Sequence, residues 1–210
     1  MKRELHLISN GKQPLQQFAE LAGKAHRWVA AFHLREKSAG ASEIMRGIEL
    51  MLQAGVPAAK IFVNDRVDAA WSARVGGVQL AWHSLDVPLV KRNFPGLKVG
   101  RSVHALDEAM EMERSGADFI VFGHIFPTAS KPDTPPRGLA ALQRVASAVR
   151  IPVIAIGGIS PDNAAQVIRA GAAGVAVMSG ILEADDQLAA VKAYEEAINE
   201  NGGIGSEQPL

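Results

Sequence analysis

Residues 151–180 read IPVIAIGGISPDNAAQVIRAGAAGVAVMSG, and this stretch decides the fold. Its first apolar run, Val153–Ile156, ends in two glycines. A segment with helical spacing follows over Asp162–Ala170, and Ser160 with the proline after it is typical of a helix start. A second apolar run, Gly174–Met178, comes soon after that segment. The stretch is therefore predicted to be a strand–helix–strand unit of a buried parallel sheet.

The same alternation recurs along the chain. The candidate strands are short and apolar: Leu5–Ser9, Val29–Leu34, Ile61–Asn64, Gly77–Leu80, Lys98–Ser102, Phe119–Gly123, Val153–Ile156 and Gly174–Met178. The segments with helical spacing include Leu15–His26, Ser42–Ala54, Leu106–Ser115, Leu139–Val149 and Asp162–Ala170. Eight such units predict an α/β fold, the single-domain (β/α)8 TIM barrel, rather than an open doubly wound sheet. We expect the barrel to span residues 1–200 and a flexible, glycine-rich tail to span 201–210.

The composition excludes several classes of protein. Hydrophobic residues make up 48% and charged residues 21% of the 210 residues, as in ordinary globular domains. Lysine and arginine (22) balance aspartate and glutamate (22), and this neutrality argues against nucleic-acid binding. The absence of cysteine excludes disulfides and thiolate chemistry. No signal peptide and no apolar run of roughly 20 residues is visible, so we expect a cytoplasmic protein without membrane contact.

Glycines follow the last two predicted strands. Gly157 and Gly158 come after strand seven, and Ser179 and Gly180 come after strand eight. In such barrels the loops after these two strands frequently bind phosphate, because glycines let backbone N–H groups approach the anion closely. These four residues are candidate phosphate ligands. The alternative is that the glycines only make tight turns.

A histidine and a long loop follow strand six. His124 stands directly after the strand, where barrel enzymes place catalytic residues, and its ordinary pKa of about 6.5 suits general acid–base catalysis. The loop over Phe126–Arg137 contains Thr128, Ser130 and Lys131, which are suited to bind a phosphate or carboxylate. The alternative for His124 is a structural role with a satisfied hydrogen bond.

Four more polar residues lie at predicted strand ends. Arg35 follows strand two, Asn64 ends strand three, and Arg101 and Ser102 end strand five. Residues in these places project over the barrel mouth, so they are candidate ligand contacts, although charged clusters are more often solvated surface. His104, a little further on, is expected to cap the next helix. No set of His, Asp and Glu has the spacing of a dedicated metal site, so we expect no metal.

Several segments resemble a known family. They read FVNDRVD at 62–68, GHIFPT at 123–128, AIGGI at 155–159 and VAVMSG at 175–180. Together they resemble the thiamine phosphate synthase superfamily, and the resemblance runs in order over about residues 5 to 198. Within that superfamily the chain is most similar to the thiazole tautomerases. Four features carry this closer likeness: HLRE at 33–36, GRSVH at 100–104, His124 directly after a glycine, and VMSG at 177–180.

The chain departs from the synthase pattern at three places. Synthases generally have proline where this chain has His124, and they carry an aspartate that helps to hold Mg²⁺ and pyrophosphate where it has Ser84. The glutamine that synthases use on the pyrimidine falls at His33. In contrast, Asn64 with the aspartate after it, and the Thr-x-Ser-Lys sequence at 128–131, are similar to the synthases.

The resemblance implies an isomerase of thiamine biosynthesis that needs no cofactor. Its substrate would be a small phosphorylated thiazole, the carboxythiazole phosphate, which the enzyme aromatises by moving a proton. His124 would be the acid–base group, the glycines after strands seven and eight would hold the phosphate, and Arg35, Arg101 or Lys131 would pair with the carboxylate.

Two alternatives stay open. One is a Mg²⁺-dependent thiamine phosphate synthase, which couples pyrimidine pyrophosphate with thiazole phosphate. The other is a non-catalytic barrel that binds a thiazole or thiamine phosphate as a regulator. Barrels of this kind often pair, so a homodimer is one possible assembly.

Overall fold

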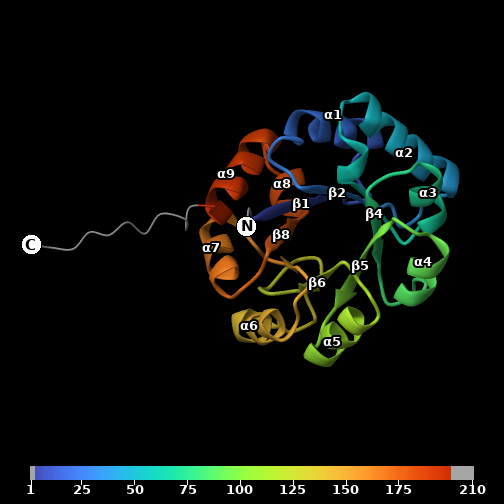
Figure 1. Ribbon diagram of the computed structural model, residues 1–210. Coiled ribbons are helices and arrows are strands. Elements are labelled where there is room, and N and C mark those ends of the chain that lie inside the picture. Colours follow the sequence, from blue (N-terminus) through green and yellow to red (C-terminus); the bar gives the residue numbers. More distant parts are fainter. Residues whose placement is uncertain (1–2, 200–210) are drawn as a thin grey trace, which may run out of the picture.

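The computed structural model describes residues 3–199 and shows a closed barrel of eight parallel strands (Figure 1). The strands are β1 (Glu4–Ile8), β2 (Ala31–Leu34), β3 (Ile61–Asn64), β4 (Gly77–Leu80), β5 (Lys98–Val103), β6 (Phe119–Gly123), β7 (Val153–Ile156) and β8 (Gly174–Val177). The helices are α1 (Leu15–Ala25), α2 (Ala41–Gln53), the 3-10 turn η1 (Ala58–Lys60), α3 (Val67–Ser72), α4 (Val87–Asn93), α5 (Leu106–Arg114), α6 (Gly138–Ala148), α7 (Pro161–Arg169), α8 (Ser179–Leu182) and α9 (Gln187–Asn199). Each strand pairs with the next along the chain, and β8 pairs with β1 to close the sheet. The predicted barrel is confirmed.

Side chains of each strand point alternately to two apolar layers. In β1, Leu5 and Leu7 lie fully buried in the outer layer, between the strands and the surrounding helices. Ile8, on the opposite face, belongs to a separate inner cluster. The buried members of that inner cluster are Ile8, Ala31, Phe62, Phe119, Val121, Ile154 and Ala176. The barrel interior is therefore a second packed core.

Two histidines lie inside this inner core. His6 is 3% exposed and His33 is 0% exposed. Both rings contact Phe119, at centroid distances of 5.8 and 6.4 Å. Gly100 makes room for Phe119, because a Cβ at Gly100 would lie 2.2 Å from the ring's Cζ. Burial lowers the pKa of His33 well below its ordinary value, and the charge of His6 acts in the same direction.

This buried histidine is expected to make the fold sensitive to acid. The His33 pKa is ordinary in the unfolded chain, about 6.5, and lower in the folded one, so below pH 6.5 the unfolded state binds the extra proton. The free energy of unfolding should then fall by up to about 1.4 kcal/mol per pH unit, until the pH reaches the folded pKa. Urea unfolding near neutral pH and about one unit below 6.5 checks this. His33→Gln should lose that part of the pH dependence, whereas His83→Gln, at an exposed position, should keep it. Equal pH dependence in wild type and His33→Gln would contradict the prediction.

Most predicted elements lie within two residues of the observed ones, and β2 shows the largest difference. It begins at Ala31 rather than Val29, because the Val29 carbonyl accepts a hydrogen bond from the Lys60 ammonium at 2.8 Å instead of joining the strand ladder. The short helices α3 and α4 and the last helix, α9, were not among the predicted segments. The predicted tail, 201–210, lies outside the described residues. Within residues 3–199, no helix has both the length and the apolar character needed to cross a membrane.

The predicted start of α7 is confirmed in detail. Ser160 and Asn163 form a reciprocal capping box, in which the Ser160 N–H donates to Asn163 Oδ1 at 2.9 Å. Pro161 occupies the first helical turn. This cap fixes where the chain leaves β7, and therefore where the two glycines after that strand lie.

Candidate active site

Three predicted site residues point into the barrel mouth. The ring of Phe62 and the missing Cβ of Gly100 both face the barrel interior. Asn64 and Ser102 stand two residues further along the same strands, so they share that inward direction at the carboxyl ends. Arg35 has the same relation to the inward-pointing His33. These side chains, from β2, β3 and β5, therefore surround one opening.

Arg101 is placed differently from its neighbour Ser102. Because successive side chains of a strand point to opposite faces, Arg101 points away from the face that carries Ser102. Its guanidinium donates a hydrogen bond to the Leu85 carbonyl, in the loop after β4, at 3.3 Å. Ser102 instead accepts a hydrogen bond from Gln79 at 3.0 Å. Of the two neighbours, Ser102 is therefore the one directed at the mouth.

Arg35 is a half-buried cation at the mouth. Its backbone N–H donates to the hydroxyl of Ser9 at 2.8 Å, and that hydroxyl donates to Glu36 at 2.5 Å. The guanidinium makes no hydrogen bond or ion pair within the described part of the chain. Burial lowers the pKa of Arg35, and the neighbouring Glu36 opposes that shift. Burial also raises the pKa of Glu36. Such a cation is available to an anionic ligand.

The glycines after β7 expose backbone N–H groups. Gly157 and Gly158 both have positive φ, at 98° and 66°, a region that glycine adopts easily. Neither N–H donates a hydrogen bond to another described residue. A Cβ at Gly157 would lie 2.1 Å from the His124 Cβ, and one at Gly158 would lie 2.4 Å from the Pro127 carbonyl oxygen. Only glycine lets this backbone pass so close to the loop after β6.

Tyr194 contacts both segments that were predicted to bind phosphate, and the sequence analysis missed it. Its hydroxyl, on α9, donates to the Ile159 carbonyl at 2.8 Å. A Cβ at Gly180 would lie 2.2 Å from the same hydroxyl. Burial raises the pKa of Tyr194, and the nearby Asp162 acts in the same direction. The ring therefore joins the turn after β7 to α8, where the exposed Ser179 and Gly180 begin the helix.

His124 is held with one ring nitrogen free. The side chain is 5% exposed, and its peptide bond to Gly123 is cis. Its Nε2 lies 3.0 Å from the Thr134 carbonyl oxygen. Because a carbonyl only accepts, Nε2 must carry the hydrogen, which leaves the lone pair of the neutral ring on Nδ1. Nδ1 has no hydrogen-bond partner among the described residues, so it is the nitrogen available to a ligand.

His104 braces the strand end that carries His124. Its Nδ1 lies 2.7 Å from the Gly123 carbonyl oxygen, to which it donates. The expectation that His104 caps the next helix is wrong, because Ala105 occupies the cap position of α5. The backbone N–H of His104 instead donates a hydrogen bond to the Glu108 carboxylate at 2.6 Å.

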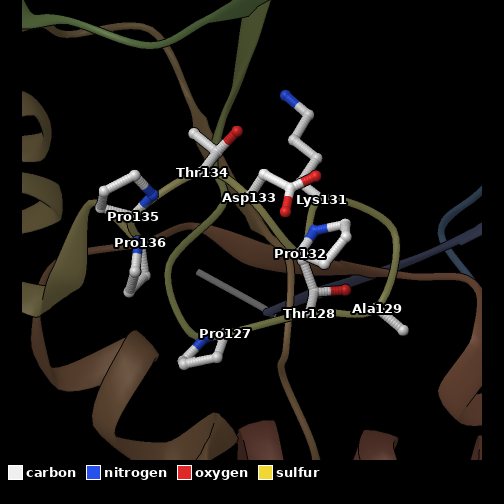
Figure 2. A pocket seen from close by; sticks show the side chains of 9 residues that line it. All are labelled: Pro127, Thr128, Ala129, Lys131, Pro132, Asp133, Thr134, Pro135 and Pro136. Atoms are coloured by element: carbon white, nitrogen blue, oxygen red, sulfur yellow. The ribbon is translucent and has the colours of Figure 1, made fainter.

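The loop after β6 folds back on its own ends. The N–H groups of Arg137 and Gly138 donate to the carbonyls of His124 and Ile125, at 2.8 and 3.1 Å. Inside the ring that results is a hollow of about 680 Å³ (Figure 2). Its lining consists of Pro127, Thr128, Ala129, Lys131, Pro132, Asp133, Thr134, Pro135 and Pro136.

Of the three candidates in this loop, Thr128 is half-buried and the other two are exposed. The Ser130 N–H donates to the Thr128 hydroxyl at 3.4 Å. The Lys131 side chain extends outward from the ring (Figure 2). Ser130 and Lys131 therefore lie on an exposed loop, and within the described residues neither forms a hydrogen bond with the glycines after β7 and β8.

The comparisons identify the family. A family model for thiamine monophosphate synthase matches residues 5–181. The chain belongs to the thiamine monophosphate synthase family. Thiamine-phosphate synthase of Anaeromyxobacter dehalogenans is 40% identical over 195 residues, which are 92% of this chain and 86% of that protein. The enzyme of that name from Pyrococcus furiosus is 40% identical over 142 residues, 68% of this chain and 69% of its own.

A solved structure extends the likeness to the whole fold. Thiamine phosphate pyrophosphorylase from Pyrococcus furiosus has a TM-score of 0.82 and 32% identity, and the match covers 96% of this chain and 98% of that one. The superfamily expected from the sequence motifs is therefore confirmed.

The family resemblance implies Mg²⁺ for the coupling reaction, and the donors at the mouth fit it poorly. Mg²⁺ takes oxygen ligands, chiefly carboxylates and phosphates. After β3, the Asp65 carboxylate lies 3.6 Å from His83 Nε2. After β4, the hydroxyl of Ser84 accepts a hydrogen bond from the Ala81 N–H at 2.7 Å. Among residues 3–199, no three His, Asp or Glu side chains gather as metal ligands. This rim is one carboxylate short of the set that the coupling reaction implies.

Proposed function

We propose that this chain is a thiazole tautomerase of thiamine biosynthesis. Membership of the thiamine monophosphate synthase family supports an enzyme of that pathway. The observation that carries the tautomerase assignment is the geometry of His124, a nearly buried imidazole with Nε2 occupied and Nδ1 free beside the phosphate-binding glycines. Such a group moves protons at neutral pH and needs neither metal nor redox cofactor.

The reaction is one proton transfer in two steps. Nδ1 of His124 removes the proton from ring carbon C2 of the carboxythiazole phosphate, 2-carboxy-4-methylthiazol-5(2H)-ylidene ethyl phosphate. The electron pair of that bond moves through the ring to the exocyclic double bond. The imidazolium keeps its Nε2–H on the Thr134 carbonyl and returns the proton from Nδ1 to the exocyclic carbon. The ring is then aromatic and the histidine is neutral again.

The anionic groups of the substrate match the remaining candidates. The phosphate accepts hydrogen bonds from the free N–H groups of Gly157 and Gly158, and Ser179 and Gly180 contact its other side. The carboxylate forms an ion pair with Arg35, whose guanidinium is half-buried and unpaired within the described residues. A charge-assisted contact there orients C2 and stabilises the electron density that spreads from it.

Arg35→Gln is expected to weaken substrate binding more than proton transfer. Loss of a hydrogen bond to a charged group should raise KM roughly tenfold to a hundredfold, because such bonds contribute about 1.5–3 kcal/mol. The matched control is Arg101→Gln, since Arg101 donates to the Leu85 carbonyl instead of facing the mouth. Steady-state kinetics of both variants check this. A larger increase of KM in Arg101→Gln than in Arg35→Gln would show that Arg101, and not Arg35, binds the carboxylate.

The assay for the proposed function follows the ultraviolet change as carboxythiazole phosphate becomes aromatic. The chain should accelerate this change without added metal, and chelation by EDTA should leave the rate unaltered. No acceleration over the uncatalysed reaction would reject the tautomerase assignment.

The synthase remains a second candidate, and the names of the relatives favour it over the isomerase. The relatives at up to 40% identity quoted above are called thiamine-phosphate synthase. Release of pyrophosphate from pyrimidine pyrophosphate and thiazole phosphate, dependent on Mg²⁺, would assign the chain to that reaction. Binding of thiazole phosphate with no turnover in either assay would instead support the non-catalytic barrel that acts as a regulator.

A further inference from the structure

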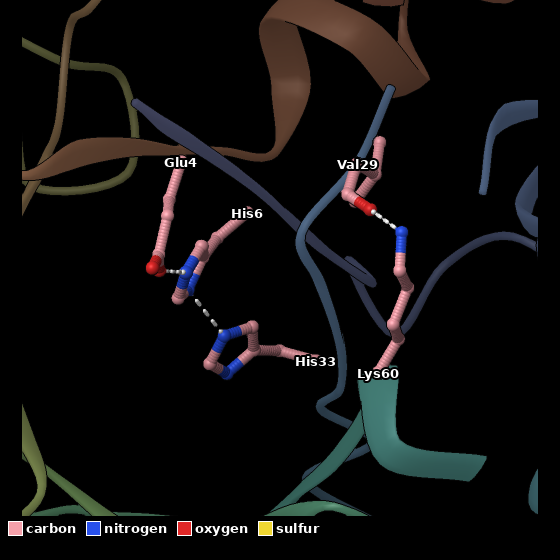
Figure 3. Close-up of polar contacts among 5 residues, drawn as sticks. All are labelled: Glu4, His6, Val29, His33 and Lys60. Atoms are coloured by element: carbon pink, nitrogen blue, oxygen red, sulfur yellow. Dashed lines mark hydrogen bonds and ion pairs between the residues drawn. The ribbon is translucent and has the colours of Figure 1, made fainter. Parts of the chain in front are cut away.

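A line of three polar side chains runs through the inner core of the barrel (Figure 3). Glu4 Oε2 lies 3.0 Å from His6 Nε2, and His6 Nδ1 lies 2.9 Å from His33 Nε2. The Glu4 side chain is 44% exposed at the amino-terminal end of β1, whereas both histidines are buried. None of these residues takes part in the proposed proton transfer. The line connects solvent at the bottom of the barrel with its closed interior.

The carboxylate at one end sets the hydrogen positions along the whole line. The hydrogen bond from His6 lowers the pKa of Glu4, although burial opposes it, so the group is ionised at neutral pH and can only accept. With both rings neutral, His6 must therefore donate from Nε2 and accept at Nδ1. His33 must then donate from Nε2 to His6, which leaves its lone pair on Nδ1.

That lone pair is buried and has no donor. His33 Nδ1 lacks a hydrogen-bond partner among the described residues, and so do three other buried acceptors, Gln13 Oε1, Asn64 Oδ1 and Gln79 Oε1. His33, Asn64 and Gln79 stand on the neighbouring strands β2, β3 and β4. A buried acceptor without a donor is unfavourable, so such a group in a native fold calls for a donor such as water, or for a function.

The unpaired end of the line lies just beneath the mouth. Arg35, just past the end of β2, is the next inward residue after His33, and Asn64 on β3 occupies the same level, since Leu34 pairs with Val63. Both are candidate substrate contacts. A proton at the floor of the mouth is therefore one side-chain layer away from His33 Nδ1.

We propose that Glu4, His6 and His33 form a proton relay along the barrel axis, between the floor of the mouth and solvent at the opposite end. A proton arriving at the floor binds His33 Nδ1, while the Nε2 hydrogen of His33 passes to His6 Nδ1. The Nε2 hydrogen of His6 then passes to the Glu4 carboxylate, which releases it to solvent. Both rings end neutral with hydrogen on Nδ1, and one proton has crossed the barrel. Passage of a proton in the opposite direction, from solvent through Glu4 to the floor, returns both hydrogens to Nε2.

The catalytic use of this relay rests on the proposed tautomerase, because the relay would exchange protons with the floor of that site. The hydrogen positions do not rest on it. In a protein with ¹⁵N-labelled histidine, NMR at about pH 8, above the ordinary imidazole pKa of about 6.5, reports which ring nitrogen of each histidine carries hydrogen. It also reports how fast the ring N–H groups exchange with water.

We expect His6 and His33 each to carry hydrogen on Nε2 and a bare Nδ1 in the wild type. In Glu4→Gln, exchange of the His33 N–H should be at least about tenfold slower, because an amide cannot take up and release a proton as a carboxylate does. The matched control is Glu49→Gln, an exposed glutamate on α2 that contacts neither histidine. It should exchange like the wild type.

Hydrogen on Nδ1 of wild-type His33 would overturn the relay, as would equal exchange rates in Glu4→Gln and wild type. If the wild type shows no aromatisation at all, the proposed function fails, and the NMR outcomes still decide the relay.

Discussion

His124→Ala is expected to lower kcat for aromatisation of carboxythiazole phosphate about 10²- to 10⁴-fold, the usual contribution of a general acid–base group. The variant loses the free Nδ1 lone pair and keeps the glycines that are proposed to bind the phosphate, so KM should change little. Removal of the ring also leaves the Thr134 carbonyl without its donor, which should loosen the loop after β6. The measurement is the ultraviolet change under saturating substrate.

The control is a histidine with similar hydrogen bonding but a remote position. His26, just after α1, has Nδ1 at 2.7 Å from the Gly23 carbonyl oxygen and lies far from the mouth. His26→Ala should therefore leave kcat unchanged. Full activity of His124→Ala would remove this histidine from the mechanism, even if the chain proved to be a tautomerase.

The fold was predictable because its signal is local and repeated. A short apolar strand followed by a helix predicts a unit of a parallel sheet, as the stretch around Ser160 illustrates, and the count of eight such units predicts the barrel. Where prediction missed, distant contacts decide the outcome. The local sequence predicts Val29 to be in the strand, but its carbonyl accepts a hydrogen bond from the Lys60 ammonium in η1. No window of local sequence contains both residues.

The candidate site was only partly predictable for the same reason. Position at the end of a strand places Arg101 and Ser102 together, but they point to opposite faces of β5, and Arg101 donates to the Leu85 carbonyl. The free nitrogen of His124 depends on Thr134, ten residues away, and Tyr194 reaches the site from α9. The sequence could have hinted at Tyr194 only by its being the single tyrosine in the chain.

Gly157→Ala is expected to damage stability and activity together. The residue has φ of 98°, and an added Cβ would lie 2.1 Å from the His124 Cβ and 2.8 Å from its Cα. The backbone conformation and the overpacking should each destabilise the fold by about 1–3 kcal/mol. Relief of the contact must shift His124, and a misplacement of about 1 Å can lower the rate roughly 10²-fold. Urea unfolding and the aromatisation assay measure both effects.

Gly55→Ala separates the two causes, because Gly55 has a similar φ of 88° but no atom within 4 Å of an added Cβ. It lies after α2, away from the mouth. This variant should lose only the conformational part of the stability and keep full kcat. If Gly157→Ala loses no more activity than Gly55→Ala, then the tight packing of the β7 turn against His124 does not position the imidazole. In that case the Thr134 carbonyl and the Gly123 strand end must position it alone.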